Sequence, residues 1–260
     1  MKWALTSGFT AATCVTLAFA GVSFAAGDTI IEANVKALEP GDEVAVARIP
    51  DGIYLRSVND PDDIIWERLP EYRMHLASAP PVHQSVELRI DEDDPGHDVY
   101  FSLARTSDRF YVRLRWRDET RDTSTLLDRF RDGAAVQFAI GGDETSYIMG
   151  SGPDEPVNIW YWRSDANKVE NLAAGGPGST TRLEEQSVSG DSRYMTGKES
   201  LANQWVVVMS RPIAAAGEHQ VSLEREQVPM AFALWQGSDG QRDGLKRVSE
   251  DWILVNLAAQ

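Results

Sequence analysis

The amino-acid sequence predicts an all-β fold, an antiparallel β-sandwich with a few short helices. Apolar and polar residues alternate in about eight short runs, and a spacing of two is the periodicity of half-buried strands. Turns rich in glycine and aspartate separate these runs, for example at residues 141–143 and 237–240. Many short strands with few helical patterns between them are typical of two antiparallel layers packed face to face.

Residues 1–25 have the pattern of an export signal. Lys2 precedes an apolar run of small residues at positions 11–20, and Ser23-Phe24-Ala25 suits cleavage by signal peptidase near Ala25. No later segment reaches the roughly 20 apolar residues that a membrane span requires. We therefore expect a mature protein without a membrane span, located outside the cytoplasm.

The rest of the chain, residues 26–260, is predicted to form one domain. Its length suits a single sizeable core, and the sequence contains neither an internal repeat nor an interdomain linker. The stretch up to about residue 81 is less periodic and contains Trp66 and several prolines. We expect this irregular N-terminal segment to lie over the sandwich before the regular strands begin.

The clearest strand is predicted at residues 109–117. Phe110, Val112, Leu114 and Trp116 share one face of this run, while arginines occupy the other face. The same pattern predicts further strands at residues 85–90, 99–104, 134–140, 157–162, 205–209, 230–235 and 252–257.

Two short helices and one long loop complete the predicted organisation. The helices are expected near residues 124–131 and 164–172, the second with Ser164 as its N-cap. Residues 175–197 are rich in Gly, Ser and Thr, and they are expected to form a long surface loop.

The cysteine content excludes several classes of site. The sequence has one cysteine, Cys14, which lies inside the predicted export signal, so the mature chain has no thiol. A disulfide framework, an iron–sulfur cluster on cysteines, covalently attached c-type haem and a thiol nucleophile are therefore all excluded. Any haem in this protein has to be bound non-covalently.

A formal net charge of −15 makes nucleic acid an unsuitable partner and favours a basic protein such as a soluble cytochrome. Acidic runs occur at residues 60–63 and 91–94, but they lack the ligand spacing and the glycine of a calcium-binding loop. We interpret these runs as solvated loops, with a calcium-stabilised structural protein as an alternative.

The search for catalytic motifs is negative. The four histidines have no His-x-x-His spacing, and the chain contains no Gly-x-Ser-x-Gly elbow and no phosphate-binding loop. We interpret the chain as a protein that does no bond chemistry by itself.

Two stretches about a hundred residues apart predict a cofactor site. Residues 147–163 contain Met149, and residues 232–249 contain Lys246. Each stretch places one possible iron ligand, a thioether or a primary amine, beside aromatic strand residues that suit the wall of a flat apolar cofactor. Together they predict a haem site, whereas a lone methionine would more often be a core residue and a lone lysine a solvated one.

The chain resembles a known family in four segments that occur in the same order. They are Val136-Gln137-Phe138, Tyr147-Ile148-Met149-Gly150, the run from Pro156 to Arg163, and the run from Phe232 to Ser249. The family is that of the b-haem-binding gamma subunits of periplasmic dimethyl sulfoxide reductase-type molybdoenzymes. It includes the gamma subunits of ethylbenzene dehydrogenase, dimethylsulfide dehydrogenase, and selenate and chlorate reductases. The resemblance covers roughly residues 86–257.

This resemblance implies a periplasmic, non-catalytic electron-transfer subunit with one non-covalent b-type haem. Met149 and Lys246 occupy the positions of the two axial iron ligands. The implied partners are a catalytic molybdopterin subunit and an iron–sulfur subunit, which form a heterotrimer with this chain, and a soluble c-type cytochrome. The haem would relay electrons between the iron–sulfur subunit and the cytochrome.

Further residues are expected near the haem. Strand alternation puts Trp160 and Trp162 on one face and Tyr161 on the other, so the three rings cannot all line one pocket. We expect Trp160 to pack near the porphyrin, with ordinary sandwich core as the alternative. Arg163 or Arg247 is expected to pair with the haem propionates.

A different class of function is also compatible with the pattern. A secreted β-sandwich with exposed tryptophans could be a carbohydrate-binding module that contains no metal, with its indole rings stacked on sugars.

Overall fold

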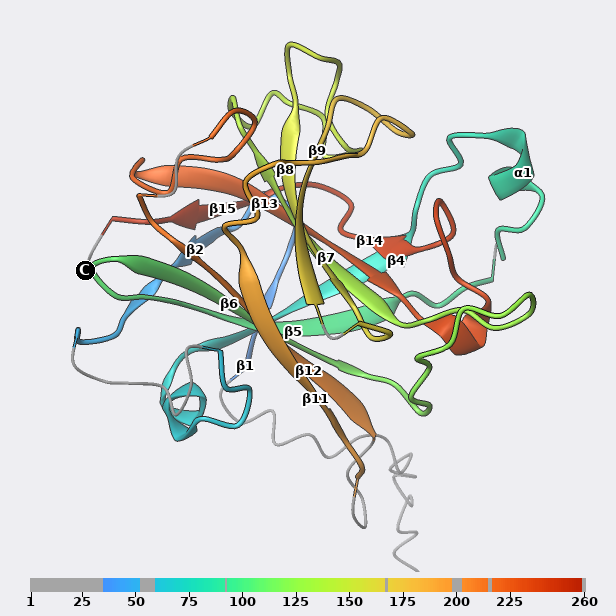
Figure 1. Cartoon of the computed structure of the whole chain (residues 1–260), viewed down its shortest axis with the longest axis horizontal. Helices are drawn as coiled ribbons and strands as arrows, with labels where there is room; N and C mark the ends of the chain where they lie inside the picture. Colours follow the sequence, from blue (N-terminus) through green and yellow to red (C-terminus); the bar gives the residue numbers. More distant parts are fainter. Residues whose placement is uncertain are drawn as a thin grey trace, which may run out of the picture.

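The computed structural model describes residues 35–51, 59–91, 93–166, 168–197, 203–214 and 217–258. The predicted export signal and Cys14 lie outside these ranges. Most of the described elements are strands, which confirms the predicted all-β class. Strands form one curled sheet whose two halves face each other as layers (Figure 1).

The first layer is centred on β5 and β6. Its strands are β1 (Val35–Leu38), β3 (Ala47–Arg48), β4 (Glu71–Ser78), β5 (His97–Arg105), β6 (Arg109–Arg117), β11 (Ser189–Met195) and β12 (Gln204–Pro212).

The second layer is centred on β7 and β13. Its strands are β2 (Glu43–Ala45), β7 (Gly133–Ala139), β8 (Val157–Arg163), β9 (Lys168–Ala174), β10 (Thr181–Arg182), β13 (Gln227–Trp235), β14 (Arg247–Val248) and β15 (Ile253–Asn256).

The two layers are joined through β4. The strand order along the sheet is β10-β9-β8-β7-β13-β14-β4-β5-β6-β12-β11, and β4 pairs with β14 on one side and β5 on the other. All neighbours along this path are antiparallel, whereas the short strands β1, β2 and β3 add parallel pairs with β4, β15 and β5. The sheet therefore passes from one layer to the other without a break at β4.

The main core lies between the layers. On β6, the alternating residues Phe110, Val112, Leu114 and Trp116 are fully buried, as their spacing predicts. Trp160 of β8 packs edge to face on Phe110 of β6, with a distance of 6.1 Å between ring centroids. Aromatic residues from both layers thus fill the same interior.

Several strand predictions are confirmed and one is wrong. The predicted strand at 109–117 matches β6, and β5, β7, β8, β12, β13 and β15 coincide with six others. The predicted strand at 85–90 is instead the short helix α1 (Gln84–Glu87), which lies at the periphery (Figure 1). The reason is local: the His83 ring accepts a hydrogen bond from the Ser85 amide at 3.1 Å and caps a helical turn there.

Both predicted helices are wrong. Residues 124–131 form turns, because the Asp132 amide donates to the Asp122 carbonyl at 2.9 Å and closes this segment as a loop. Residues 168–172 belong to β9, whose buried Val169, Asn171 and Ala173 follow strand periodicity. The Ser164 hydroxyl donates to the Asp122 carbonyl at 2.6 Å instead of capping a helix.

The expected long loop and the expected N-terminal covering are also wrong in part. Within residues 175–197, β10 pairs with β9, and β11 pairs with β12 along its full length. Residues 71–78 form β4, which is an internal strand of the sheet. Among the described residues of this segment, the 3-10 helix η1 (Ile64–Arg68) covers an outer face, where Trp66 is buried with Tyr111.

Candidate cofactor site

A cavity of about 530 Å³ lies on the outer face of the second layer. Its walls come from β7, β8 and β13, from the loop that carries Met149, from the turn that carries Lys246, and from the segment around α1. The volume lies within the range of roughly 300–1,000 Å³ that is usual for small-molecule and cofactor sites.

Small residues on two neighbouring strands make the hollow. Ala135 of β7 and the pair Ala231 and Ala233 of β13 line the cavity, while the residues that alternate with them point into the core. A methyl group reaches a much shorter distance from the sheet than a larger side chain does. The alternation of alanines with large residues therefore leaves space on one face while it fills the other.

On β8, the two faces are equally distinct. Ile159 and Tyr161 line the cavity, whereas Trp160 and Trp162 are fully buried in the core on the opposite side. Trp160 therefore does not line the cavity. It lies in the sandwich core, which was the alternative that the sequence left undecided. The aromatic wall comes instead from Tyr161 and Trp235, whose rings pack edge to face at 5.2 Å.

A strained loop presents Met149 to the cavity. Met149 has φ of 61° and Gly150 has φ of 91°, so two consecutive residues lie in the left-handed region. The Gly150 amide donates to the Ser146 carbonyl at 2.9 Å, and the Met149 carbonyl accepts from Gly176 at 2.7 Å. A Cβ on Gly150 would lie 2.8 Å from the Glu155 carbonyl oxygen, which explains why glycine follows the methionine.

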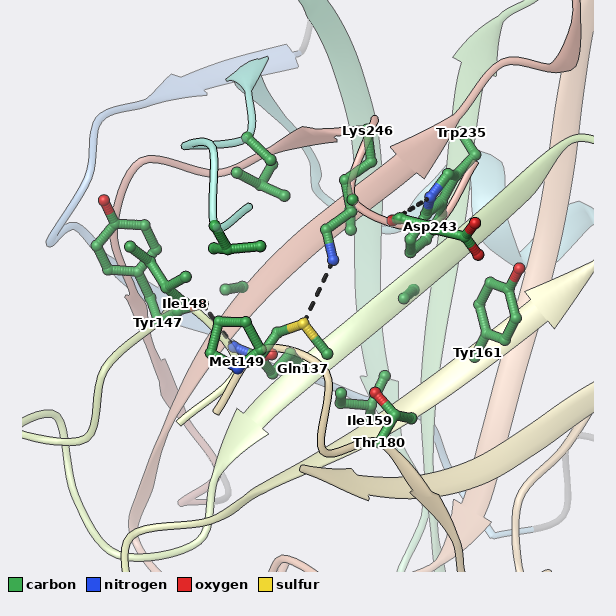
Figure 2. A pocket seen from close by; sticks show the side chains of 18 of the residues that line it. Gln137, Tyr147, Ile148, Met149, Ile159, Tyr161, Thr180, Trp235, Asp243 and Lys246 are labelled. Carbon is green, nitrogen blue, oxygen red and sulfur yellow. Dashed lines mark hydrogen bonds between the residues drawn. The ribbon is translucent and has the colours of Figure 1, made fainter. Parts of the chain in front are cut away.

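Lys246 enters the same cavity from the opposite wall. Figure 2 shows its amine pointing at the sulfur of Met149, and Nζ lies 3.6 Å from Sδ. The ammonium also lies 5.1 Å from the centroid of the Trp235 ring. The position of Lys246 is set by its main chain, because its carbonyl accepts from the Ala79 amide at 2.8 Å and the next residue begins β14.

The electrostatics around Lys246 are unusual for a lysine. Within the described ranges, no carboxylate forms an ion pair with its amine, and burial lowers the pKa of Lys246 to about 8. A lower pKa means that the neutral amine, which has the free electron pair needed to bind a metal, is more accessible than in a solvated lysine.

Arg247 and Arg163 lie outside the cavity lining. The Arg247 guanidinium pairs with Asp94 at 3.0 Å and with Asp239 at 3.0 Å. Arg163 lies near Asp165, with 3.5 Å between Nε and Oδ1. Each expected propionate partner thus lies beside a carboxylate of the protein and outside the cavity lining.

Sequence reasoning missed part of the lining. Gln137 faces the cavity and donates from Nε2 to the Tyr147 carbonyl at 2.8 Å, which ties the Met149 loop to β7. Trp235 donates from its indole to the Asp243 carbonyl at 3.1 Å and so holds the turn before Lys246 (Figure 2). The signal that could have found this wall is the alternation of alanines with large residues at 231–235.

Other expected sites find no support in the described part of the chain. His, Cys, Asp and Glu side chains form no group of three there that could hold a metal ion. Every tryptophan within the described ranges is buried except Trp235, which is half-buried against the cavity. These residues therefore provide no exposed indole platform of the kind that the carbohydrate-binding alternative needs.

Known proteins match this chain, one of them over nearly all of its length. The ethylbenzene dehydrogenase family model matches residues 63–186. The gamma subunit of dimethylsulfide dehydrogenase from Rhodovulum sulfidophilum is 55% identical over 253 residues, which are 96% of this chain and 96% of that protein. The chain belongs to the ethylbenzene dehydrogenase family of gamma subunits.

A second relative supports membership of this gamma-subunit family. The gamma subunit of chlorate reductase from Ideonella dechloratans is 33% identical over 194 residues, covering 74% of this chain and 77% of that protein. Gamma subunits are accessory members of dehydrogenase and reductase complexes and not their catalytic subunits.

A solved structure is similar in outline only. A family 9 carbohydrate-binding module from Caldicellulosiruptor kristjanssonii aligns with a TM-score of 0.45 and 10% identity, covering 84% of this chain and 97% of that chain. Likeness at this level carries no argument about function. In the described ranges of this family member, none of the helices has the length and apolar character needed to traverse a bilayer.

Proposed function

We propose that this gamma subunit is an electron-transfer protein that holds one b-type haem in the cavity, with Met149 and Lys246 as the axial ligands of its iron. The observation that carries the proposal is the approach of Lys246 Nζ to Met149 Sδ at 3.6 Å, between residues 97 positions apart in the chain. A thioether and an unpaired buried amine that meet inside a largely apolar cavity are a donor set for a soft metal centre.

The surrounding residues fit such a group. Alanines at 135, 231 and 233 keep one wall flat, and the Trp235 ring supplies an aromatic surface beside Lys246. The lowered pKa of Lys246 favours the neutral amine, which is the form that coordinates iron. A bound haem would supply a one-electron couple, and two side-chain ligands would keep other molecules from the iron.

Partners and location follow from the family and the charge. We propose that the chain works in the periplasm within a heterotrimer with a catalytic molybdopterin subunit and an iron–sulfur subunit. Its relatives are gamma subunits of a dehydrogenase and a reductase, which supports assembly with other subunits. The net charge of −15 favours encounter with a basic c-type cytochrome, and this attraction should weaken as salt is added.

The test is an absorption spectrum of the protein expressed in the periplasm, recorded oxidised and after reduction with dithionite. The wild type should show a low-spin b-type spectrum. Met149→Ala and Lys246→Ala should each become high-spin or lose the haem, because each removes one axial ligand.

Matched controls separate ligation from general damage. Met195 and Lys168 are exposed residues of β11 and β9. Met195→Ala and Lys168→Ala should therefore leave the spectrum unchanged. A wild-type protein that stays colourless when haem is supplied would overturn the proposal.

A further inference from the structure

A second cavity, of about 420 Å³, adjoins the first. Four residues line both cavities: Arg131, Tyr161, Trp235 and Asp243. The two spaces therefore meet at the aromatic pair Tyr161 and Trp235, and they are two compartments of one site rather than separate pockets.

The two compartments differ in chemistry. The first contains the apolar walls and Lys246. The second adds the guanidinium group of Arg242 to that of Arg131, which lines both compartments, together with Thr125 and Gln241. Arg242 lies over the Phe130 ring, with 4.5 Å from its guanidinium carbon to the ring centroid. Its guanidinium forms no ion pair with any residue in the described ranges, so the ring holds it in place without neutralising its charge.

Arg131 is only partly neutralised. Its Nε lies 3.4 Å from Asp165 Oδ1, and Arg163 Nε lies 3.5 Å from the same oxygen, so one carboxylate serves two guanidiniums. Arg131 Nη1 donates to Asp165 Oδ2 at 3.5 Å, but its Nε is buried and makes no hydrogen bond within the described part of the chain, which is also true of the Nε atoms of Arg163 and Arg211. A buried guanidinium donor without a hydrogen-bond acceptor is costly unless a ligand supplies one.

The arginines of the second compartment contrast with the negative net charge of the whole protein. The protein as a whole has a net charge of −15, and an anionic ligand would be repelled from most of its surface. Arg131, Arg242 and one carboxylate, that of Asp243, line the second compartment, and Arg242 has no ion-pair partner within the described ranges. This compartment is therefore suited to an anion, and the planar fork of arginine matches a carboxylate in particular.

We propose that Arg131 and Arg242 bind the carboxylate groups at one edge of the cofactor while its apolar body occupies the first compartment. This inference rests on the proposed haem function and assigns the propionate-binding residues of the same site. The ligand class is a flat amphipathic tetrapyrrole with anionic groups on one edge. Arg163 and Arg247 do not take this role, because neither lines either compartment.

The experiment compares haem with its dimethyl ester, in which both carboxylates are neutral. Each is titrated into the haem-free full-length protein, and the Kd is measured from the Soret absorption. The wild type should bind haem at least roughly tenfold more tightly than the ester, because hydrogen bonds to a charged group are worth about 1.5–3 kcal/mol.

The arginine variants then test which side chains produce the preference for haem over the ester. Arg131→Gln and Arg242→Gln should each weaken haem binding by roughly tenfold or more and leave ester binding unchanged, and the double variant should bind both ligands equally. Arg129→Gln is the matched control, because Arg129 is an exposed arginine of the same loop that lines neither cavity. This control should retain the full preference for haem.

The outcomes separate the two hypotheses. If the wild type binds neither ligand, the haem function is overturned and the assignment of the arginines falls with it. If the wild type binds haem and ester equally well, or the double variant retains the preference, the haem function stands and the arginine assignment is overturned. The wild-type comparison needs no variant, so a folding defect in a variant cannot hide the answer.

Discussion

The two faces of the strands β7, β8 and β13 differ in packing: one face is a closed core and the other borders a cavity. The inner face presents large residues such as Phe138 and Trp160, which are fully buried against the other layer. The outer face presents alanines and the cavity that contains Lys246. Each strand contributes to both faces through the same alternation, so one stretch of sequence encodes a closed core and an open site.

Buried cations on the two faces show what this difference means. Arg211, in the core, donates to Asn158 Oδ1 at 3.3 Å and to the Val221 carbonyl, and its guanidinium lies 5.5 Å from the Trp160 ring centroid. Lys246, on the cavity side, has a sulfur atom as its hydrogen-bond acceptor. The core gives the Arg211 guanidinium two oxygen acceptors, although its Nε makes no hydrogen bond within the described part of the chain, whereas the Lys246 amine meets only a sulfur atom and stays available to a ligand.

The largest change in the free energy of unfolding should come from truncating one aromatic side chain on the core face. Trp160→Ala should lower the free energy of unfolding by about 3–5 kcal/mol, because the indole is fully buried and its loss leaves a cavity. Urea denaturation of the haem-free protein measures the change.

Tyr161→Ala is the matched change on the same strand and the opposite face. Its ring borders the open cavity, so the loss should be only about 1 kcal/mol. Equal losses in the two variants would mean that the cavity face is packed as tightly as the core, and the comparison would fail.

The second effect has the opposite sign. Lys246→Met should raise the free energy of unfolding of the haem-free protein at pH 7 by up to about 3 kcal/mol, because it removes a buried charge and keeps a similar volume. Burial lowers the pKa of Lys246 from 10.5 to about 8, so the folded state holds the charged amine at a cost below pH 8. That cost disappears as the pH rises from about 8 to 10.5.

Denaturation curves at pH 7 and pH 10 test this prediction. The gain from Lys246→Met should be large at pH 7 and should shrink at pH 10. The exposed Lys168 provides the control, and Lys168→Met should change stability by less than about 0.5 kcal/mol at either pH. A Lys246→Met protein that is less stable than the wild type at pH 7 would contradict the prediction.

The smallest of the three effects concerns Asp94, the ion-pair partner of Arg247. Burial by itself raises the pKa of Asp94, but hydrogen bonds from Arg247, from Ser78 and from the Gly96 amide outweigh it and hold the pKa at about 2, below the ordinary 3.8. The stability from this lowered pKa is present above about pH 4 and is lost as the pH falls towards 2.

Asp94→Asn isolates this contribution. The wild type should exceed the variant by about 2 kcal/mol at pH 5, and the difference should vanish near pH 2. The comparison uses denaturation at several acid pH values, since many other carboxylates titrate in both proteins and cancel in the difference. A difference that does not depend on pH would show that the ion pair with Arg247 does not set this pKa.

The sequence predicted the regular strands well because their signal is local. The alternation along residues 109–117 reports directly which side chains share a buried face, and β6 matches it. The predictions failed where distant contacts overrode local preference. Residues 168–174 became β9 because β8 offered a partner edge along its full length. The segment at 124–131 became a loop because Asp132 and Asp122 closed it.

The residues of the site show the same difference between local sequence signals and distant contacts. Met149 and Lys246 could be singled out from the sequence because each stands in a distinctive segment, whereas Trp160 was a choice between two faces that alternation alone could not make. Periodicity states which residues share a face, but not what covers that face. Arg131 and Arg242 gave no signal, because an arginine in a loop has no periodic pattern to mark it.

By itself, then, the sequence determined the all-β class, the inward and outward residues of its clearest strands, and the two segments that carry the proposed iron ligands. Only the tertiary structure decided that Lys246 faces Met149, because that requires β14 to lie between β13 and β4. The physical reason is that strand periodicity is encoded within a few neighbouring residues, whereas the pairing of strands distant in the chain depends on the packing energy of the whole sheet.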